Sequence, residues 1–277
     1  MKLLSIVITS YNQGVFLSNA IKSVRAQKTS DVELIIIDDG STDNSLEIIK
    51  SNSDIIDYWS TWENKGQSQA INEGIFRASG KYVTWLCSDD LLSVNFVIYI
   101  FEIIKANNYA KDVLIYGGYN IIDNNDIVQE KYYNCSVPNF FISKLGPNII
   151  LPGTVFSKLK FEEVGGFDDS LLYCMDLDLW MKLFKSGVKF IGTSHILSSF
   201  RTHPQQKGHT LYWLEFSVKE EFDLRKRFNM AARNTVHYKV LRYLLILYKL
   251  FFAKRLNTLL FRLFVHSRLR MYNSRYS

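Results

Sequence analysis

The first 120 residues alternate short apolar runs with longer segments whose apolar side chains recur at the spacing of a helix. Short runs rich in β-branched residues are typical of buried strands, and helical spacing is typical of a helix that packs on a sheet. The predicted strands lie at 4–8, 34–37 and 82–86, and the predicted helices at 16–24, 45–50 and 70–78. This order implies an α/β fold with a Rossmann-like, mainly parallel sheet that has helices on both faces.

The second half of the chain has a weaker pattern. We expect a further strand pair within 113–122, long connections around a pocket across 123–152, and a loop at 165–169. A helical stripe follows at Leu179, Trp180, Leu183 and Phe184, and Gly187 ends it.

Three polar clusters follow directly after predicted strands. They are 9–12 (TSYN), Asp38-Asp39 and Ser88-Asp89-Asp90. In open α/β sheets ligands bind beyond the carboxyl ends of the strands. We therefore expect the three clusters to meet in one binding site.

Two acidic motifs suggest specific chemistry. Asp89 and Asp90 are adjacent carboxylates, which are costly to bury together unless a cation or strong donors compensate them. A hard divalent ion suits one or two carboxylates together with substrate phosphates. Asp176 begins a predicted helix, where it either caps the helix or serves as a general base. By itself, an adjacent pair of aspartates favours a solvated acidic loop over a metal site.

The order of these motifs resembles that of family 2 of the glycosyltransferases, which have the GT-A fold. The resemblance runs from Ser5 to His203. It rests on six blocks in the family's order: SIVITSYNQGVFLSNAIKSVRAQ, VELIIIDDGSTDNS, GQSQAINEGIFRASGKYVTWLCSDD, YGGYNIID, GGFDDSLLYCMDLDLWMKL and FRTHPQQ. The resemblance implies an inverting, metal-dependent transfer of a sugar from a UDP-linked donor to a hydroxyl of a glycan or lipid-linked acceptor, as in bacterial surface-polysaccharide assembly.

The resemblance also implies roles for a set of nucleotide-binding and donor-binding residues. Asp39 would accept a hydrogen bond from the pyrimidine ring and Asp38 would support it, while Asp89 would contact ribose or the donor sugar. The remaining expected members of this set are Thr9, Tyr11, Gln67 and Ser68.

The other implied roles concern chemistry. Asp90 would ligate Mn²⁺ or Mg²⁺, His203 would be a further metal or diphosphate ligand, and Asp176 would be the catalytic base. Two departures from the family pattern stand out. The chain has Met175-Asp176 where the family commonly has Glu-Asp, which removes a carboxylate beside the base, and its metal motif is S-D-D rather than D-x-D.

Charge divides the chain into two regions. All 27 Asp and Glu lie at or before Asp223, whereas residues 224–277 contain 13 Lys and Arg. We predict a catalytic domain over 1–215 and a basic, amphipathic helical region over 216–277. The face formed by Val240, Leu241, Leu244, Leu245 and Tyr248 is apolar, and its flank is basic. This favours an anionic membrane surface as partner over nucleic acid, although a helix packed on the catalytic body fits the pattern too.

Other features bear on location and function class. The three cysteines, Cys87, Cys135 and Cys174, are widely spaced, which argues against a zinc site or a disulfide framework and fits a reducing cytoplasm. We find no signal peptide and no apolar run long enough to cross a membrane, so we expect a peripheral protein on the cytoplasmic face of the inner membrane. A dinucleotide-dependent oxidoreductase is disfavoured, because G-x-G-x-x-G is absent after the first strand. A nucleotide-sugar-binding assembly partner without activity remains the alternative.

Overall fold

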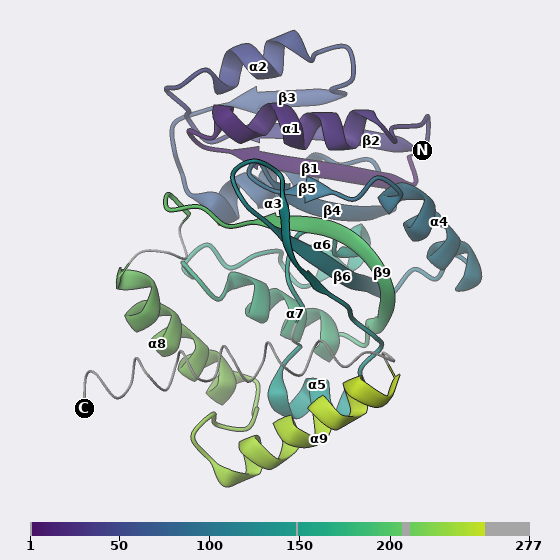
Figure 1. Ribbon diagram of the computed structural model, residues 1–277, viewed down its shortest axis with the longest axis vertical. Helices are drawn as coiled ribbons and strands as arrows, with labels where there is room; N and C mark the ends of the chain where they lie inside the picture. The colour runs from purple at the N-terminus through teal and green to yellow at the C-terminus, as the bar shows by residue number, and fades with distance from the viewer. Residues whose placement is uncertain (1, 148, 207–210, 253–277) are drawn as a thin grey trace.

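The computed structural model describes residues 2–147, 149–206 and 211–252. Its centre is a nine-stranded sheet of order β3-β2-β1-β4-β8-β6-β9-β5, with β7 paired to β6 (Figure 1). The strands are β1 (Leu4–Ser10), β2 (Val32–Asp38), β3 (Tyr58–Thr61), β4 (Tyr82–Cys87), β5 (Leu91–Leu92), β6 (Val113–Ile122), β7 (Val128–Tyr132), β8 (Val155–Ser157) and β9 (Lys189–Arg201).

Helices cover both faces of the sheet. The helices are α1 (Gly14–Arg25), α2 (Ser45–Ser51), α3 (Gln67–Arg77), α4 (Phe96–Ala106), α5 (Asn139–Leu145), α6 (Lys158–Glu163), α7 (Met175–Lys185), α8 (Leu211–Arg227) and α9 (Val236–Phe252). One core lies between the sheet and α1, α2 and α4, and a second lies between the sheet and α3, α6 and α7. Alternate residues of β1 serve the two cores: Ile6 and Ile8 the first, Val7 the second. The predicted α/β sheet flanked by helices is confirmed.

The amino-terminal part of the sheet is parallel and brings the polar strand ends together. In the register of β1, Ser10 lies beside Asp38 of β2, and Thr9 lies beside Cys87 of β4. The clusters that follow these strands therefore share one edge of the sheet, as the sequence predicted.

The antiparallel pairs of the sheet are β4 with β8, β6 with β8, β5 with β9 and β6 with β7. The expected strand pair within 113–122 is wrong, because these residues form the single strand β6. Gly117 and Gly118 make no turn there. They let neighbouring backbone approach closely: a Cβ on Gly118 would lie 2.4 Å from the Tyr132 carbonyl oxygen, and one on Gly117 would lie 2.5 Å from Leu197.

The basic carboxyl-terminal region is helical as far as the structure describes it, and residues 253–277 of the predicted region lie outside the described residues. The proposed division at 215/216 falls inside α8. Helix α9 packs on α5, where Leu241 and Leu245 contact Leu145. Val240 and Leu244, expected on the same face, are instead 51% and 46% exposed. None of the described helices is both long enough and apolar enough to span a bilayer.

Candidate active site

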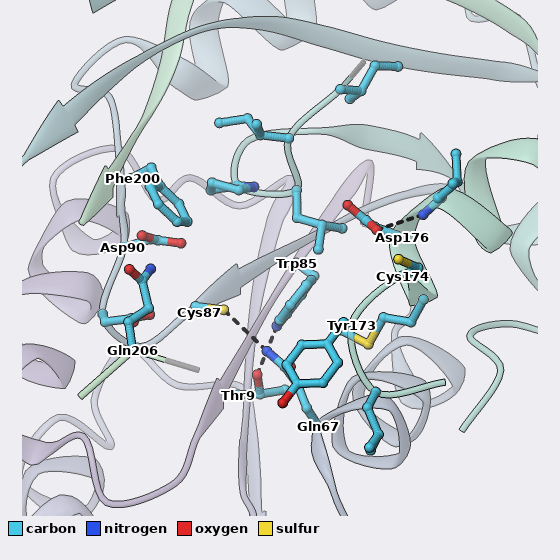
Figure 2. A pocket seen from close by; sticks show the side chains of 18 of the residues that line it. Thr9, Gln67, Trp85, Cys87, Asp90, Tyr173, Cys174, Asp176, Phe200 and Gln206 are labelled. Carbon is cyan, nitrogen blue, oxygen red and sulfur yellow. Dashed lines mark hydrogen bonds between the residues drawn. The ribbon is translucent and has the colours of Figure 1, made fainter. Parts of the chain in front are cut away.

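A cavity of about 1350 Å³ opens at the carboxyl edge of β1, β2 and β4. Cavities that bind one small ligand are commonly about 300–1,000 Å³. Residues 9–13 and 87–90, the start of α7, and parts of α8 and α9 line it. Its size therefore suits two substrates side by side. Figure 2 shows Asp90 and Asp176 on opposite sides of this pocket.

Asp90 is buried at one end of the cavity, with 2% of its surface exposed. Its Oδ1 accepts a hydrogen bond from the backbone N–H of Arg201 at 2.9 Å. Burial, and after it the negative charge of Asp89, raise the pKa of Asp90 well above its ordinary value. The hydrogen bond and the positive charge of Arg201 offset only part of the cost of ionising this carboxyl.

Arg201 holds this pair of acids in place. Its fully buried side chain donates from Nε to the backbone oxygen of Asp89 at 2.7 Å and forms an ion pair with Asp126. The guanidinium also lies over the Phe16 ring, 4.6 Å from the ring centroid. No role for Arg201 was predicted from the sequence beyond its place in the FRTHPQQ block. A buried arginine is costly without partners, and those partners come from segments far away in the sequence.

The donor set at this end fits a divalent cation. Ligand atoms of Cys87, Asp89 and Asp90 lie within 4.8 Å of one another. Carboxylate oxygens are the ligands that Mg²⁺ and Mn²⁺ prefer, and a cation would offset the cost of ionising the buried Asp90. His203, the other predicted ligand, contributes its Nε2 to a 3.0 Å contact with Asp89 Oδ2. Its Nδ1 is buried and has no hydrogen-bond partner among the described residues.

The predicted base pocket lies beside this end. Asp39 lines the cavity, and its carboxylate accepts hydrogen bonds from the Trp62 indole N–H at 3.0 Å and from the backbone N–H groups of Lys65 and Gly66 at 2.9 and 3.0 Å. It therefore fixes the loop at 62–66 against the cavity. Asp39 thus has a structural task that the sequence did not reveal.

Other predicted donor-binding residues line the cavity nearby. Thr9 accepts a hydrogen bond from the Trp85 indole N–H at 2.8 Å, and the Gln67 amide lies 3.6 Å from the Cys87 sulfur (Figure 2). Tyr11 is half exposed at the cavity wall.

Three predicted residues do not line the cavity but lie behind those that do. Asp38 is fully buried and accepts from the Ser41 backbone N–H and the Thr61 hydroxyl. The Ser68 hydroxyl donates to the Met175 sulfur at 2.9 Å. His203 stands behind Asp89, as described above. The structure therefore gives these three residues supporting contacts in place of direct access to the cavity.

Asp176 lies in the first turn of α7 and faces the cavity from the other side (Figure 2). Its Oδ1 accepts the backbone N–H of Leu177 at 2.7 Å. Burial raises the pKa of Asp176 to about 6, and the charge of Glu221 adds to the rise. A carboxyl with this pKa is ionised at neutral pH yet more basic than an ordinary aspartate, which suits a general base.

The loop before α7 is held by α8. The Glu220 carboxylate accepts the backbone N–H groups of Leu172, Tyr173 and Cys174 at 2.8–2.9 Å. The next residue, Glu221, lines the cavity near Asp176. Glu221 is thus a carboxylate near Asp176 that comes from a different helix. The sequence contained no sign of it, because contact between α7 and α8 depends on tertiary packing.

Comparison with known proteins gives the family. The family model "Glycosyl transferase family 2" matches residues 5–164. An uncharacterized glycosyltransferase of Rickettsia prowazekii is 34% identical over 216 residues, which are 75% of this chain and 66% of that protein. The chain therefore spans slightly less than two thirds of that relative's length.

Two further proteins resemble the chain. One is the UDP-Glc:alpha-D-GlcNAc-diphosphoundecaprenol beta-1,3-glucosyltransferase WfgD of Escherichia coli, 29% identical over 72% of this chain and 77% of WfgD. The other is the crystal structure of S. aureus TarS 1-349 in complex with UDP-GlcNAc, with a TM-score of 0.63 and 16% identity over 81% of this chain and 67% of that one. This likeness in fold agrees with the predicted GT-A architecture. The chain belongs to glycosyl transferase family 2.

Proposed function

We propose that the protein transfers a sugar from a UDP-linked donor to an acceptor hydroxyl with inversion of the anomeric configuration. The observation that supports this most strongly is the placement of Asp90 and Asp176 on opposite sides of one cavity. An inverting displacement needs leaving-group stabilisation on one side of the sugar and a base on the other.

The donor would lie along the carboxyl edge of the sheet. Asp39 and Thr9 would receive the nucleotide, and the Asp89-Asp90 end would receive the diphosphate. Asp90, with Asp89, would hold Mn²⁺ or Mg²⁺, which when bound supplies positive charge to the diphosphate leaving group. Arg201 and His203 keep the two carboxylates oriented, and we keep direct ligation by His203 as a prediction.

Asp176 would act on the acceptor. Its carboxylate takes the proton from the acceptor hydroxyl while the hydroxyl oxygen bonds to the anomeric carbon and the bond to the diphosphate breaks. Because this is a single displacement, no sugar–enzyme bond forms. Residues of α7, α8 and α9 form the walls of this end of the cavity.

The names of two relatives support the proposed donor and acceptor classes. UDP and UDP-sugar appear in the names of WfgD and the TarS complex, and we take a UDP-sugar as donor here. WfgD acts on a lipid-linked acceptor, and we propose a glycan or lipid-linked acceptor for this chain as well.

We also propose that the protein works at the cytoplasmic face of the membrane. A stripe on α9 is apolar and 44–76% exposed, and consists of Val236, Val240, Tyr243, Leu244 and Leu247. Residues 224–277 carry 13 Lys and Arg and no acid. An apolar stripe beside basic residues favours contact with anionic lipid.

Release of UDP from a panel of UDP-sugars tests the proposal. The full chain should release UDP from one or more donors with Mn²⁺ or Mg²⁺ and stop when the ion is chelated. An Asp90→Ala variant should remain folded and lose activity by orders of magnitude. Full activity after exhaustive chelation would show that the mechanism needs no metal ion. Binding of UDP without any turnover would favour the alternative, a nucleotide-sugar-binding assembly partner without activity.

A further inference from the structure

The positive charges in the cavity are segregated. Among the described residues that line it, the cationic ones are Arg225, Arg233 and Arg242, and all come from α8, α9 or the connection between them. The opposite end presents Asp39, Asp89 and Asp90 in the same lining. The wall contributed by the three arginines is called the arginine wall below.

The arginine wall lies at the Asp176 end. Glu221 is bound to two of its members: the Arg225 Nε at 2.7 Å and an Arg233 terminal nitrogen at 2.6 Å. Glu221 is close enough to Asp176 for its charge to add to the effect of burial in raising the pKa of Asp176. Its neighbour Glu220 binds the backbone just before α7. The wall therefore faces the place of the acceptor, if Asp176 is the base.

The three arginines differ in how many of their donors are used. Arg225 is a scaffold residue, because it also donates to the backbone oxygens of Ala231 and Leu145 at 2.9 and 3.2 Å. Arg233 has its ion pair with Glu221, and its side chain is 60% exposed. Arg242 is partly buried and, among the residues that the structure describes, has neither a hydrogen-bond acceptor nor an ion-pair partner.

A guanidinium that is partly buried in a cavity without an acceptor has unmet hydrogen-bonding capacity. Planar, bidentate donors of this kind match phosphate oxygens well. One acid, Glu221, stands among the three arginines, so the wall keeps a net positive charge. The ligand that complements it is a phosphate or diphosphate group.

We propose that Arg242, with Arg233, binds a phosphate or diphosphate group carried by the acceptor substrate. This inference rests on the proposed function, which places the donor diphosphate at the Asp89-Asp90 end and leaves the arginine wall to the acceptor. Such a phosphate site narrows the acceptor class to sugars that are attached to their carrier through a phosphate or diphosphate, such as a lipid diphosphate sugar. Free glycans are disfavoured as acceptors.

Binding of decyl diphosphate to the full chain tests this proposal. Calorimetry is performed on protein saturated with UDP and metal ion, so that the donor's diphosphate site is filled. Wild type should bind the probe, and Arg242→Gln should weaken binding about tenfold, the cost of losing a charge-assisted hydrogen bond. Arg242→Lys should recover part of the loss, because it keeps the charge but not the planar fork.

Lys239→Gln is the matched control, because Lys239 is exposed on the same helix and does not line the cavity. It should bind the probe like wild type. Anionic vesicles of phosphatidylglycerol distinguish a lipid headgroup as the source of phosphate. If Arg242→Gln and Lys239→Gln reduce vesicle binding equally, while only Arg242→Gln reduces probe binding, the site belongs to the acceptor.

Two results would overturn the proposal. The first is probe binding that is absent in wild type or unchanged in Arg242→Gln. The second is a loss of UDP affinity in Arg242→Gln equal to the loss of probe affinity, which would assign the arginine to the donor. Failure of the proposed function looks different, since wild type would then release no UDP from any donor, whether or not it binds UDP.

Discussion

At the scale of single residues, environment gives the acidic groups of the cavity different tasks. Asp39 accepts hydrogen bonds from three N–H donors of the 62–66 loop, whereas Asp90 has one backbone donor and a neighbouring carboxylate. Asp176 has one backbone donor and a pKa raised by burial. These environments support the proposed division of tasks, in which Asp39 anchors the 62–66 loop, Asp90 would hold a cation and Asp176 would be the base.

The pKa of Asp176 predicts a pH dependence. A base works only when it is ionised, and the folded-state pKa is raised to about 6. We expect kcat/KM to be level above about pH 7 and to fall about tenfold per pH unit below 6. Initial rates from pH 5 to 8 check this, with UDP binding measured across the same range as the control. A profile that is flat over this range would contradict the assignment of Asp176.

We expect that substitution of Asp39 lowers the affinity for UDP. Asp39→Ala removes the carboxylate that we propose binds the pyrimidine ring of UDP. It also removes the anchor of the 62–66 loop. UDP affinity should fall by about 1–3 kcal/mol, the cost of losing a hydrogen bond to a charged group. Calorimetry measures this affinity. The temperature is kept well below the midpoint of thermal unfolding, because the variant also loses three hydrogen bonds and is less stable. If its affinity for UDP equals that of wild type, the base pocket lies elsewhere.

At the scale of elements, the parallel part of the sheet was predictable because each strand is marked by its own residues. The runs at 4–8, 34–37 and 82–86 fell within β1, β2 and β4, and the polar residues that end these strands met at one edge, as parallel pairing predicts. The short strands β5 and β8 were not predictable, since two or three residues carry no periodicity. Gly117-Gly118 misled the prediction at β6, because glycine marks both turns and close backbone contacts.

The candidate site was predictable to a similar extent. Asp39, Asp89, Asp90 and Asp176 reached the cavity, because strand ends and a helix start are local features, whereas Asp38 lies behind the lining residues. Arg201, Glu221 and the arginine wall were missed. Their roles depend on contacts between segments that are distant in sequence, and the basic residues of α9 produce the same pattern whether they face lipid or a cavity.

We expect that a substitution in α8 displaces Asp176, the proposed catalytic base. Glu220→Gln weakens the three hydrogen bonds that hold 172–174, so the start of α7 shifts. Turnover should fall by about 10- to 100-fold while UDP affinity is unchanged. Asp223→Asn is the matched control, because Asp223 is exposed on the same helix. Equal turnover in the two variants would show that the loop does not depend on Glu220.

At the scale of the whole molecule, the carboxyl-terminal helices have two roles. Their inner side packs on α5 and lines the cavity, and the outer stripe of α9 is apolar and exposed. The packed helix and the membrane-binding helix, which the sequence offered as alternatives, are therefore compatible. Together they would place the cavity close to a lipid-linked acceptor.

Vesicle sedimentation tests the outer stripe. The full chain should pellet with anionic vesicles and be released by high salt, because screening weakens its contact with the surface. Leu244→Glu with Leu247→Glu should lower the bound fraction several-fold, since charge is placed in the stripe. Leu159→Glu is the control, an equally exposed apolar residue on α6. If the double variant pellets like wild type, the stripe does not meet the membrane.

The substitution Asp176→Asn tests the central claim most directly, because it removes the base and keeps the shape of the side chain. Burial disfavours the ionised carboxyl above its pKa of about 6, so at pH 7.5 the variant should unfold at the same temperature as wild type or higher. We predict that UDP release in the presence of acceptor falls about 10²- to 10⁴-fold, while UDP affinity by calorimetry is unchanged. A variant that turns over like wild type would contradict the account.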